Sequence, residues 1–513
     1  MKKYLLLSVL AIAMVSLISC QDNIEPIAPT VSQGETSSHT IPVDQALENL
    51  KDFLNDSPKT RSLVDGISLT NVITVRTNHI HTRATNLPED CNTLMYAVNF
   101  SDENGYALLS ADNRIEDAVI AVTSEGSISQ NDIEAAKADM DDSQKTIFED
   151  YPTTGDGLIS IPEYPNEKFL NPNTFNPYDS VSNDSWVGDF SEDNIGEEDE
   201  NGNLIDNAAG TRATSLTQAS ACNRKVMAMC LSYAVDEVYG YETGGGGGGS
   251  SFTSTRTTYG SWTDVIKRGN ILSSYYSWQQ NSPFNDMFPR RRKYLIFGHR
   301  RKVPAGCFPL ALAKVLTHFQ YPSVFRYNGE KVDWNSVNNV YFSDTGRHSA
   351  AVLLKGIADW CGCWYFYAGT FTIPSHASSF LKDIGFTNVK RYDYKYDRVT
   401  SMIDKGCPVI IYAMPGIKIT SSHAWIIDGY KIKTRDNVIT RFQNGKVVST
   451  KTESETSKMV HCDFGWGGKC NGYYVDGIFK LNNSENEFDN NNHNRNTNYN
   501  HHKRIIVYDN PNN

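Results

Sequence analysis

The sequence predicts an α+β fold, in which helices come first and antiparallel strands follow in the C-terminal half of the chain. Residues 308–319 and 349–361 are apolar or helix-forming stretches and predict two helices. Strand-like runs follow them at 408–412, 423–428, 458–464, 472–481 and 504–509. This order of elements is typical of one α+β domain.

The N-terminal half has its own pattern of helix and strands. Residues 43–54 carry apolar side chains at the spacing of an amphipathic helix. Two runs at 95–100 and 105–110, separated by a short polar stretch, predict a β-hairpin. These elements predict a second α+β domain ahead of the first.

The two halves are joined by a region of different character. Residues 151–210 are rich in proline and acidic side chains and lack periodicity, so we expect them to be irregular and mostly exposed. A helix is predicted over 226–238, and 244–249 is a run of six glycines. Residues 200–256 are therefore the best candidate for a domain boundary and for proteolytic nicking.

Composition narrows the class of protein. The 513 residues suffice for two to four domains, and 39% hydrophobic residues suffice for packed cores. A net charge of −11 provides no broad basic field, which argues against a nucleic-acid partner. The local basic runs 290–293 and 300–302 are interpreted as a solvated loop ahead of the helix at 308, although a binding patch is the alternative.

The N-terminus predicts export. Lys2 and Lys3 precede an apolar stretch, residues 4–18, that is too short for a comfortable membrane span. It ends in Leu-Ile-Ser-Cys at 17–20, which resembles the lipobox of a bacterial lipoprotein, with Cys20 as the lipidated residue. We expect a protein anchored by lipid to the bacterial outer membrane, on the periplasmic side or the cell surface, or released after processing. An ordinary signal peptide with an incidental cysteine is the alternative.

Nine cysteines remain after Cys20, and an odd number in an exported protein suggests at least one free thiol. The pairing of the others stays open. Cys361 and Cys363 are too close in sequence for the usual zinc spacing, so no metal and no cofactor are expected.

Cys307 is the candidate nucleophile. It precedes the predicted helix at 308–319, where backbone N–H groups and the helix dipole stabilise a thiolate. Pro309 fits the first turn, where its missing N–H is not needed. A thiol nucleophile needs a histidine within reach. His318 lies eleven residues along the same helix, roughly 16 Å away, and is excluded.

His423 is the candidate partner because it opens a strand-like segment in the second half, opposite a cysteine on a helix of the first half, as in papain-type enzymes. Downstream, Asp463 could accept a hydrogen bond from the imidazole, fix its tautomer and stabilise its charged form. Trp466 could shield that bond from water, and glycines at 465, 467 and 468 let the backbone turn closely around the site.

These motifs resemble the streptopain family of papain-like cysteine peptidases. The resemblance spans 278–481 and includes Trp-Gln-Gln at 278–280, Gly306-Cys307, His423-Ala424 and Gly-Trp-Gly-Gly at 465–468. The run Ala-Val-Asn-Phe at 97–100 and the following strand resemble the family propeptide.

The resemblance implies a role for each matching residue. Cys307 would be the nucleophile, His423 the general acid/base, and the side-chain amide of Gln280 an oxyanion donor beside the Cys307 N–H. Asp463 stands where the family usually has asparagine. Three further residues would shape the substrate-binding site: Trp466, Gly306 and Ser422. The chain departs from the family at Asp463, at Phe464, and at Phe308 and Pro309.

The resemblance also implies an organisation and a function. We expect a signal peptide over 1–20, an inhibitory propeptide over 21–212, a glycine-rich activation segment over 213–256 and a papain-like catalytic domain over 257–513. The protein would be a secreted cysteine endopeptidase made as a zymogen, acting on protein or peptide substrates and activated by cleavage at Arg212 or Arg256. A surface-binding lipoprotein on a degenerate peptidase fold and a papain-like acyl transferase or amidase are the alternatives.

Overall fold

The computed structural model describes residues 39–54, 72–76, 91–141, 187–188, 210–243, 253–272, 277–292, 300–366, 369–413, 423–443, 446–479 and 503–512. The chain divides into two compact units, Met1–Ser38 and His39–Asn513, and all of the described residues lie in the second. The predictions for Cys20, Ser422 and the glycine run 244–249 fall outside the described residues. In the parts that are described, no helix is long and apolar enough to cross a membrane.

The helices form where their apolar periodicity predicted them, with some additions. The predicted helices are confirmed as α2 (Val43–Phe53), α6 (Cys307–Phe319) and α7 (Asp344–Trp360). Ser343 caps α7 by accepting a hydrogen bond from the Gly346 N–H. Sequence analysis missed α4 (Gln130–Asp141), α8 (Pro374–Asp383) and α9 (Tyr396–Asp404). Single helical turns are η2 (Ser101–Glu103), η8 (Val337–Asn339) and η10 (Asp476–Phe479).

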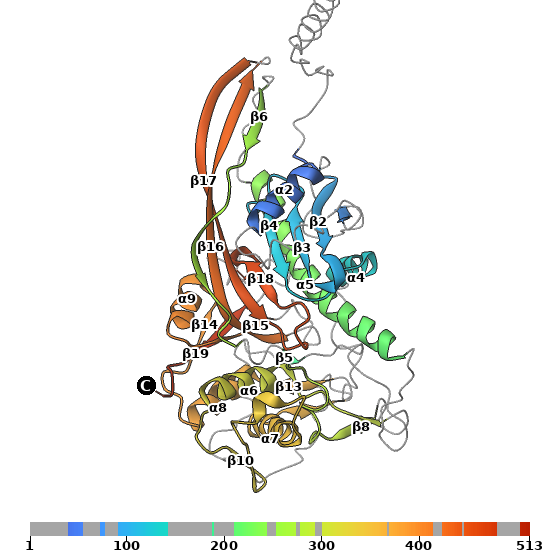
Figure 1. Cartoon of the computed structure of the whole chain (residues 1–513), viewed down its shortest axis with the longest axis vertical. Coiled ribbons are helices and arrows are strands. Elements are labelled where there is room, and N and C mark those ends of the chain that lie inside the picture. The colour runs from blue at the N-terminus through green and yellow to red at the C-terminus, as the bar shows by residue number, and fades with distance from the viewer. Residues whose placement is uncertain are drawn as a thin grey trace, which may run out of the picture. The chain divides into compact units, whose positions relative to one another are not determined.

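The α+β prediction is confirmed by one large antiparallel sheet beside these helices (Figure 1). Its main path runs through β1 (Val72–Arg76), β2 (Thr93–Asn99), β3 (Tyr106–Ser110), β4 (Val119–Thr123), β18 (Gly472–Val475), β17 (Lys446–Asp463), β16 (His423–Gln443), β15 (Val409–Ala413), β19 (Arg504–Val507) and β14 (Lys390–Asp393). The predicted N-terminal hairpin is confirmed as β2 and β3, with Met95 opposite Ser110. The nucleophile's helix, α6, packs against β16 and α7.

Strands β16 and β17 are much longer than the sequence predicted. Only their inner ends, 423–431 and 459–463, are continuously buried, whereas most of the outer half of β17 is exposed. Figure 1 shows both strands running past the ends of β15 and β18. Two further strands, β7 (Thr263–Arg268) and β6 (Thr253–Thr258), pair with the outer part of β16. Backbone pairing, rather than an apolar face, therefore holds the outer hairpin.

The N-terminal strands continue the same sheet as the C-terminal strands. Strand β4 pairs with β18, with Thr123 opposite Gly472. A side chain at position 472 would come within 2.2 Å of the Val122 carbonyl oxygen, so only glycine permits this approach. The Ser124 N–H and hydroxyl both donate to the Asn471 carbonyl, at 3.0 and 3.1 Å. The two predicted α+β parts thus share a hydrogen-bonded junction.

The helix predicted over 226–238 is confirmed as the middle of the longer helix α5 (Gly210–Thr243), within the segment that we expected to be a linker. This stretch is buried, including Val226, Leu231 and Val238, each at 0% exposure. A helix that is apolar on every side packs on every side, because it has no face suited to water. Arg212 lies within the bounds of α5, and Arg256 lies exposed in β6, opposite Thr440 of β16.

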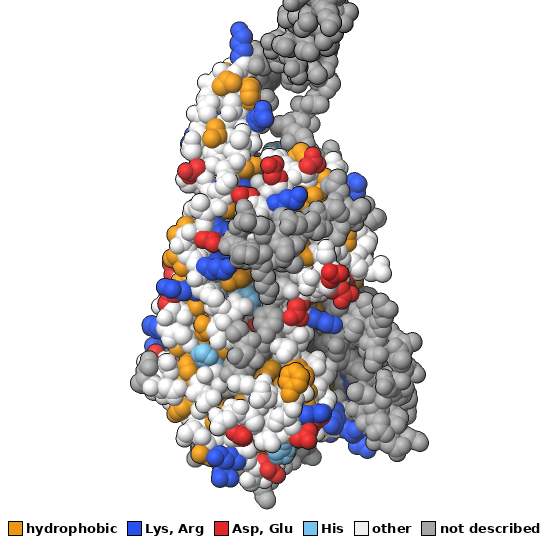
Figure 2. Space-filling model, viewed as in Figure 1, with side chains coloured by type: hydrophobic (Ala, Val, Ile, Leu, Met, Phe, Trp, Pro, Cys, Tyr) orange, Lys and Arg blue, Asp and Glu red, His pale blue; other side chains and the backbone are white. Residues whose placement is uncertain are grey.

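The basic segment before α6 forms a small hairpin rather than a fully solvated loop. Strand β8 (Arg290–Arg292) pairs with β9 (Arg300–Lys302). Arg301 is only 5% exposed, and Lys302 forms an ion pair of 3.1 Å with Asp286. On the face drawn in Figure 2, basic and acidic side chains of the described residues are interspersed.

The remaining strands are short. Strand β10 (Arg326–Tyr327) pairs with β11 (Glu330–Lys331), and β13 (Thr370–Thr372) pairs with both β12 (Trp364–Tyr365) and β5 (Val187–Gly188). Strand β13 lies next to the approach to α6, because the Thr370 hydroxyl donates to the Pro304 carbonyl at 2.6 Å.

Candidate active site

Cys307 is the first residue of α6, as predicted, and is 2% exposed. Gly306 before it has φ 94°, a conformation that side chains disfavour. A Cβ at position 306 would also lie 3.0 Å from the Thr370 Cβ. Gly306 therefore allows the chain to turn sharply into the helix and leaves the Cys307 sulfur at the positive end of the helix dipole.

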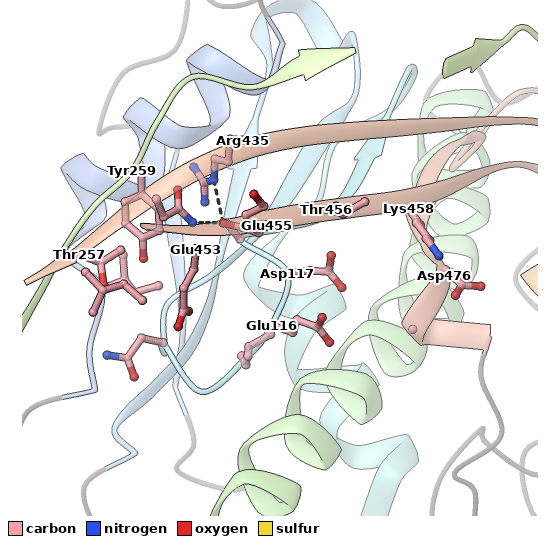
Figure 3. Close-up of a pocket in the computed structure, with 18 residues that line it drawn as sticks. Glu116, Asp117, Thr257, Tyr259, Arg435, Glu453, Glu455, Thr456, Lys458 and Asp476 are labelled. Carbon is pink, nitrogen blue, oxygen red and sulfur yellow. Dashed lines mark hydrogen bonds and ion pairs between the residues drawn. The ribbon is translucent and has the colours of Figure 1, made fainter. Parts of the chain in front are cut away.

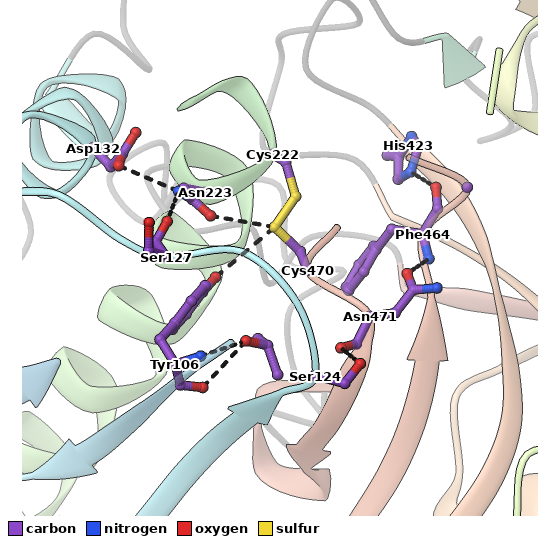
Figure 4. Close-up of a disulfide and its surroundings, with 12 residues drawn as sticks. Tyr106, Ser124, Ser127, Asp132, Cys222, Asn223, His423, Phe464, Cys470 and Asn471 are labelled. Carbon is purple, nitrogen blue, oxygen red and sulfur yellow. Dashed lines mark hydrogen bonds between the residues drawn. A yellow bond between two sulfur atoms is a disulfide. The ribbon is translucent and has the colours of Figure 1, made fainter. Parts of the chain in front are cut away.

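His423 begins β16 and lies opposite Ala413 of β15. Its Nε2 donates to the Phe464 carbonyl oxygen at 2.9 Å (Figure 4). The Trp466 ring stacks on the imidazole with 4.4 Å between ring centroids and 15° between planes. Because Nε2 carries the proton in this bond, Nδ1 is the nitrogen of a neutral imidazole that can accept one. The imidazole, which is 5% exposed, is thus oriented by this hydrogen bond and by the stacked Trp466 ring.

Asp463 takes a different position from the one predicted. Its Oδ2 lies 2.5 Å from the Lys314 ammonium nitrogen of α6. Its Oδ1 accepts from the Gly465 N–H at 3.1 Å and from the Asn471 side-chain amide at 3.0 Å. A buried carboxylate is stabilised most by a cation, so it binds Lys314. The acceptor for His423 is the next residue's carbonyl, that of Phe464.

Gln280 lies between the approach to Cys307 and the glycine-rich loop. Its backbone carbonyl accepts from the Ala305 N–H at 2.8 Å, two residues before the nucleophile, and the residue is 6% exposed. Two residues earlier, the Trp278 carbonyl accepts from the Gly467 N–H at 3.1 Å. The backbone thus ties Gln280 to both sides of the site, and the oxyanion role of its side chain stays a prediction.

Two residues of this network were missed in the sequence, Lys314 and Asn471. Lys314 is the single lysine, arginine or acidic residue within helix α6, and its place among Leu312, Ala313 and Val315 could have signalled a buried partner. Asn471 uses its side-chain oxygen to accept from the Phe464 N–H at 2.9 Å. An asparagine eight residues after the aspartate leaves no such signal.

The N-terminal half reaches the same loop. Lys225 of α5 lies over the Trp466 ring at 5.7 Å from its centroid. Cys222 of α5 forms a disulfide with Cys470, the residue before Asn471 (Figure 4). Next to it, the Asn223 amide donates to the Ser127 carbonyl at 2.7 Å and to the Asp132 carboxylate at 3.2 Å. The loop that carries Trp466 is therefore covalently joined to α5.

The other described cysteines are buried: Cys91, Cys230, Cys307, Cys361, Cys363, Cys407 and Cys462. Burial raises the pKa of the Cys407 thiol to about 11 and that of the Cys361 thiol well above its usual value. Such thiols stay protonated and unreactive at neutral pH.

The helix that presents a buried thiol, the antiparallel sheet that presents a histidine, and the loop between them define a papain-like cysteine peptidase. Residues 278–474 match the sequence model of the Peptidase C10 family. This segment, less than half of the chain, resembles the streptopain family of cysteine peptidases, a family that acts on proteins. Among solved structures, the chain is similar to the active wild-type interpain A cysteine protease of Prevotella intermedia. The identity is 18% and the TM-score 0.32, over 48% of this chain and 96% of that one. No curated protein matches the chain.

A separate acidic cavity of about 600 Å³ lies away from this site (Figure 3). Glu116 and Asp117 of the N-terminal half line it, together with Glu453 and Glu455 of β17 and Asp476 of η10. Arg435 and Lys458 are the basic residues in its wall, and Arg435 binds Glu455 at 2.8 Å. The cavity thus brings carboxylates of both halves together.

We expect this cavity to make stability fall as pH rises. Burial, with smaller contributions from Glu116, Glu455 and Glu237, raises the pKa of Asp117 from 3.8 to about 7, although the Tyr233 hydroxyl that it accepts from opposes the shift. The folded protein therefore keeps a proton that the unfolded chain releases, and the stabilisation, complete below pH 3.8, is lost as pH rises to about 7, with more than half of the loss above pH 5. The shift corresponds to about 4 kcal/mol, and screening in the open cavity reduces it to about 2 kcal/mol.

Urea denaturation of the full chain at pH 5 and pH 8 measures this difference. In the Asp117→Asn variant the free energy of unfolding should differ little between the two pH values. The Glu48→Gln variant, changed at an exposed position of α2, should show the same decrease as the native chain. An equal decline in Asp117→Asn and the native chain would assign the pH dependence to other groups.

Proposed function

We propose that the chain is a zymogen of a cysteine endopeptidase, with Cys307 as the nucleophile and His423 as the general acid/base. The observation that best supports this mechanism is the hydrogen bond from His423 Nε2 to the Phe464 carbonyl oxygen, because it leaves Nδ1 to exchange the proton. The helix N-terminus at Cys307 supports the thiolate. Asp463 has no direct part in this assignment.

The proposed reaction proceeds through a thioester. The Cys307 sulfur attacks the carbonyl carbon of the scissile peptide bond, and the thiol proton passes to His423. The Cys307 N–H and the Gln280 amide would donate to the oxyanion. The C–N bond then breaks as His423 protonates the leaving amine. Water, deprotonated by His423, attacks the thioester, which releases the acid product and restores the thiol.

Three observations support the zymogen state. Cys307 and His423 are 2% and 5% exposed, so a protein substrate needs more space than this conformation provides. Strand β4 of the N-terminal half pairs with β18, next to the loop of Trp466. Lys225 and Cys222 of α5 contact that loop directly. We propose that the N-terminal half separates from the loop and opens the site after cleavage at Arg212, which leaves α5 on the loop, or after cleavage at Arg256 combined with reduction of the Cys222–Cys470 disulfide.

We further propose that the protein is exported and lipid-anchored through Cys20. The charged start, the apolar stretch and the Leu-Ile-Ser-Cys sequence at 17–20 support this proposal. Mass spectrometry of the N-terminal peptide of membrane-extracted protein tests it, because an unmodified peptide that still contains residues 1–19 would contradict it.

Comparison of the native chain with Cys307→Ala tests the catalytic proposal. After proteolytic removal of the N-terminal half, we expect the native protein to cleave a denatured protein substrate and the variant to lose activity by about 10³-fold or more. N-terminal sequencing of both proteins locates the activation cut and shows whether Cys307 is needed for it.

Cys407→Ala is the matched control, because that thiol is buried and has its pKa raised to about 11. It should keep full activity and full iodoacetamide labelling of Cys307 at pH 6. Equal hydrolysis by the native protein and Cys307→Ala would overturn the proposal and favour a binding protein on a degenerate peptidase fold. Ammonia release without peptide cleavage would favour an amidase or acyl transferase.

A further inference from the structure

The ion pair between Lys314 and Asp463 is fully buried, with each side chain 1% exposed and 2.5 Å between Nζ and Oδ2. Lys314 belongs to the same helix as Cys307, seven residues further along, and the residues on either side of it are apolar and buried. Burying two charges is costly, and two apolar side chains would pack there at less cost. This cost indicates that the ion pair has a role other than stabilising the fold.

Asp463 organises the loop that follows it. While Oδ2 binds Lys314, Oδ1 accepts from the Gly465 N–H and from the Asn471 amide. Asn471 in turn accepts from the Phe464 N–H at 2.9 Å. The peptide groups on both sides of Phe464 are thus fixed by the carboxylate and the amide.

The residue held in this way is the one that orients the imidazole. The Phe464 carbonyl accepts from His423 Nε2, and Trp466 two residues later stacks on the same ring. The loop also rests directly on α6, because a Cβ at position 465 would lie 2.6 Å from the Leu310 Cδ2. Continuous contacts therefore connect the helix of the nucleophile to the partner of the histidine.

We propose that Lys314 and Asp463 form a positioning pair for catalysis, in which the lysine on the nucleophile's helix anchors the loop whose Phe464 carbonyl sets the orientation and tautomer of His423. This inference rests on the proposed roles of Cys307 and His423. Neither Lys314 nor Asp463 touches the reacting atoms. Asp463 acts through Phe464, and Lys314 acts through Asp463.

The test is a set of three variants, Lys314→Gln, Asp463→Asn and the double variant, each folded as the full chain and assayed after proteolytic removal of the N-terminal half. Each single change leaves one buried charge without its partner, whereas the double variant replaces the ion pair by two amides of similar size that can hydrogen-bond. A displacement of about 1 Å at the imidazole costs up to about 100-fold in rate. We expect each single variant to lose 10- to 100-fold in kcat, with KM within about threefold, and the double variant to recover most of the loss.

The pH profile of kcat/KM separates positioning from simple loss of stability. An unpartnered Lys314 charge in Asp463→Asn disfavours a protonated imidazole, so the alkaline limb of the profile should move to lower pH. An unpartnered carboxylate in Lys314→Gln should move the same limb to higher pH. The double variant should lie between them. Loss of folded protein alone would scale all profiles without moving them.

Two controls keep the result interpretable. Lys355→Gln removes another ion pair, between Lys355 and Asp359 on α7, and should leave kcat unchanged. Cys307→Ala reports separately on the proposed reaction. Single variants with native kcat, or a folded double variant as inactive as the singles, would overturn the positioning role while Cys307→Ala stays inactive. An active Cys307→Ala would instead overturn the proposed function.

Discussion

His423→Gln is expected to lower kcat/KM for a protein substrate by about 10³- to 10⁴-fold, because it removes the group that takes and returns the proton. Glutamine keeps a donor for the Phe464 carbonyl, the acceptor of His423 Nε2 at 2.9 Å. The loop and the stacked Trp466 should therefore stay in place. The loss should appear in kcat, and iodoacetamide labelling of Cys307 at pH 6 should slow, since no imidazolium remains to stabilise the thiolate.

His318→Gln is the matched control on helix α6. The His318 Nε2 lies 3.0 Å from the Gly406 carbonyl, and burial lowers the pKa of this histidine. It should therefore be a neutral donor that glutamine can replace, with activity within about twofold of native. An equal loss of activity in the two variants would show that His423 has a structural role only.

Removal of the disulfide between Cys222 and Cys470 is expected to have the largest effect on stability. The bond joins residues 248 positions apart, and closing so long a loop in the unfolded chain is worth about 2–5 kcal/mol. The double variant Cys222→Ala/Cys470→Ala should therefore unfold at clearly lower urea concentration without reductant. With reductant, the native chain and the double variant should unfold at similar urea concentrations. Cys230→Ala, a free buried thiol on α5, controls for loss of a sulfur atom.

The same bond makes the activation cut visible on a gel. A cut at Arg256 lies between the two cysteines, so the N-terminal fragment stays attached until a thiol reductant is added. A cut at Arg212 lies before Cys222 and leaves the fragment bound by noncovalent contacts only, among them the β4–β18 junction. Fragments that separate under denaturing, non-reducing conditions after a cut at Arg256 would contradict the disulfide.

The fold was predictable where apolar periodicity was strong. Helices α2, α6 and α7 and the β2–β3 hairpin lie where the pattern placed them. The outer hairpin of β16 and β17 was not predictable, because threonine, serine and charged side chains dominate it and apolar residues such as Val447 and Val448 lie exposed. Helix α5 was underestimated, since its polar ends conceal a buried middle.

The candidate catalytic residues were predictable from the sequence, but the contacts between the side chains of the site were not. The positions of Cys307 and His423 at the start of a helix and of a strand follow from local sequence. The partner of Asp463 does not, because Lys314 lies 149 residues away in sequence and only the packing of α6 on the sheet brings the charges together. The acceptor of His423 is a backbone atom of Phe464, which no side-chain pattern can reveal.

The strand that begins with His423 continues outward as an edge that β7 and β6 cover. A cut after Arg256 falls inside β6 and separates residues 253–256 from the rest of that strand. These residues could then leave β16, where they pair with Thr440 to Gln443. That departure would uncover a row of unpaired N–H and carbonyl groups, on which strands from a second molecule can assemble. A cut in the glycine run before β6 would leave the edge covered. We therefore expect the place of the proposed cleavage to decide whether the activated enzyme stays dispersed or self-associates.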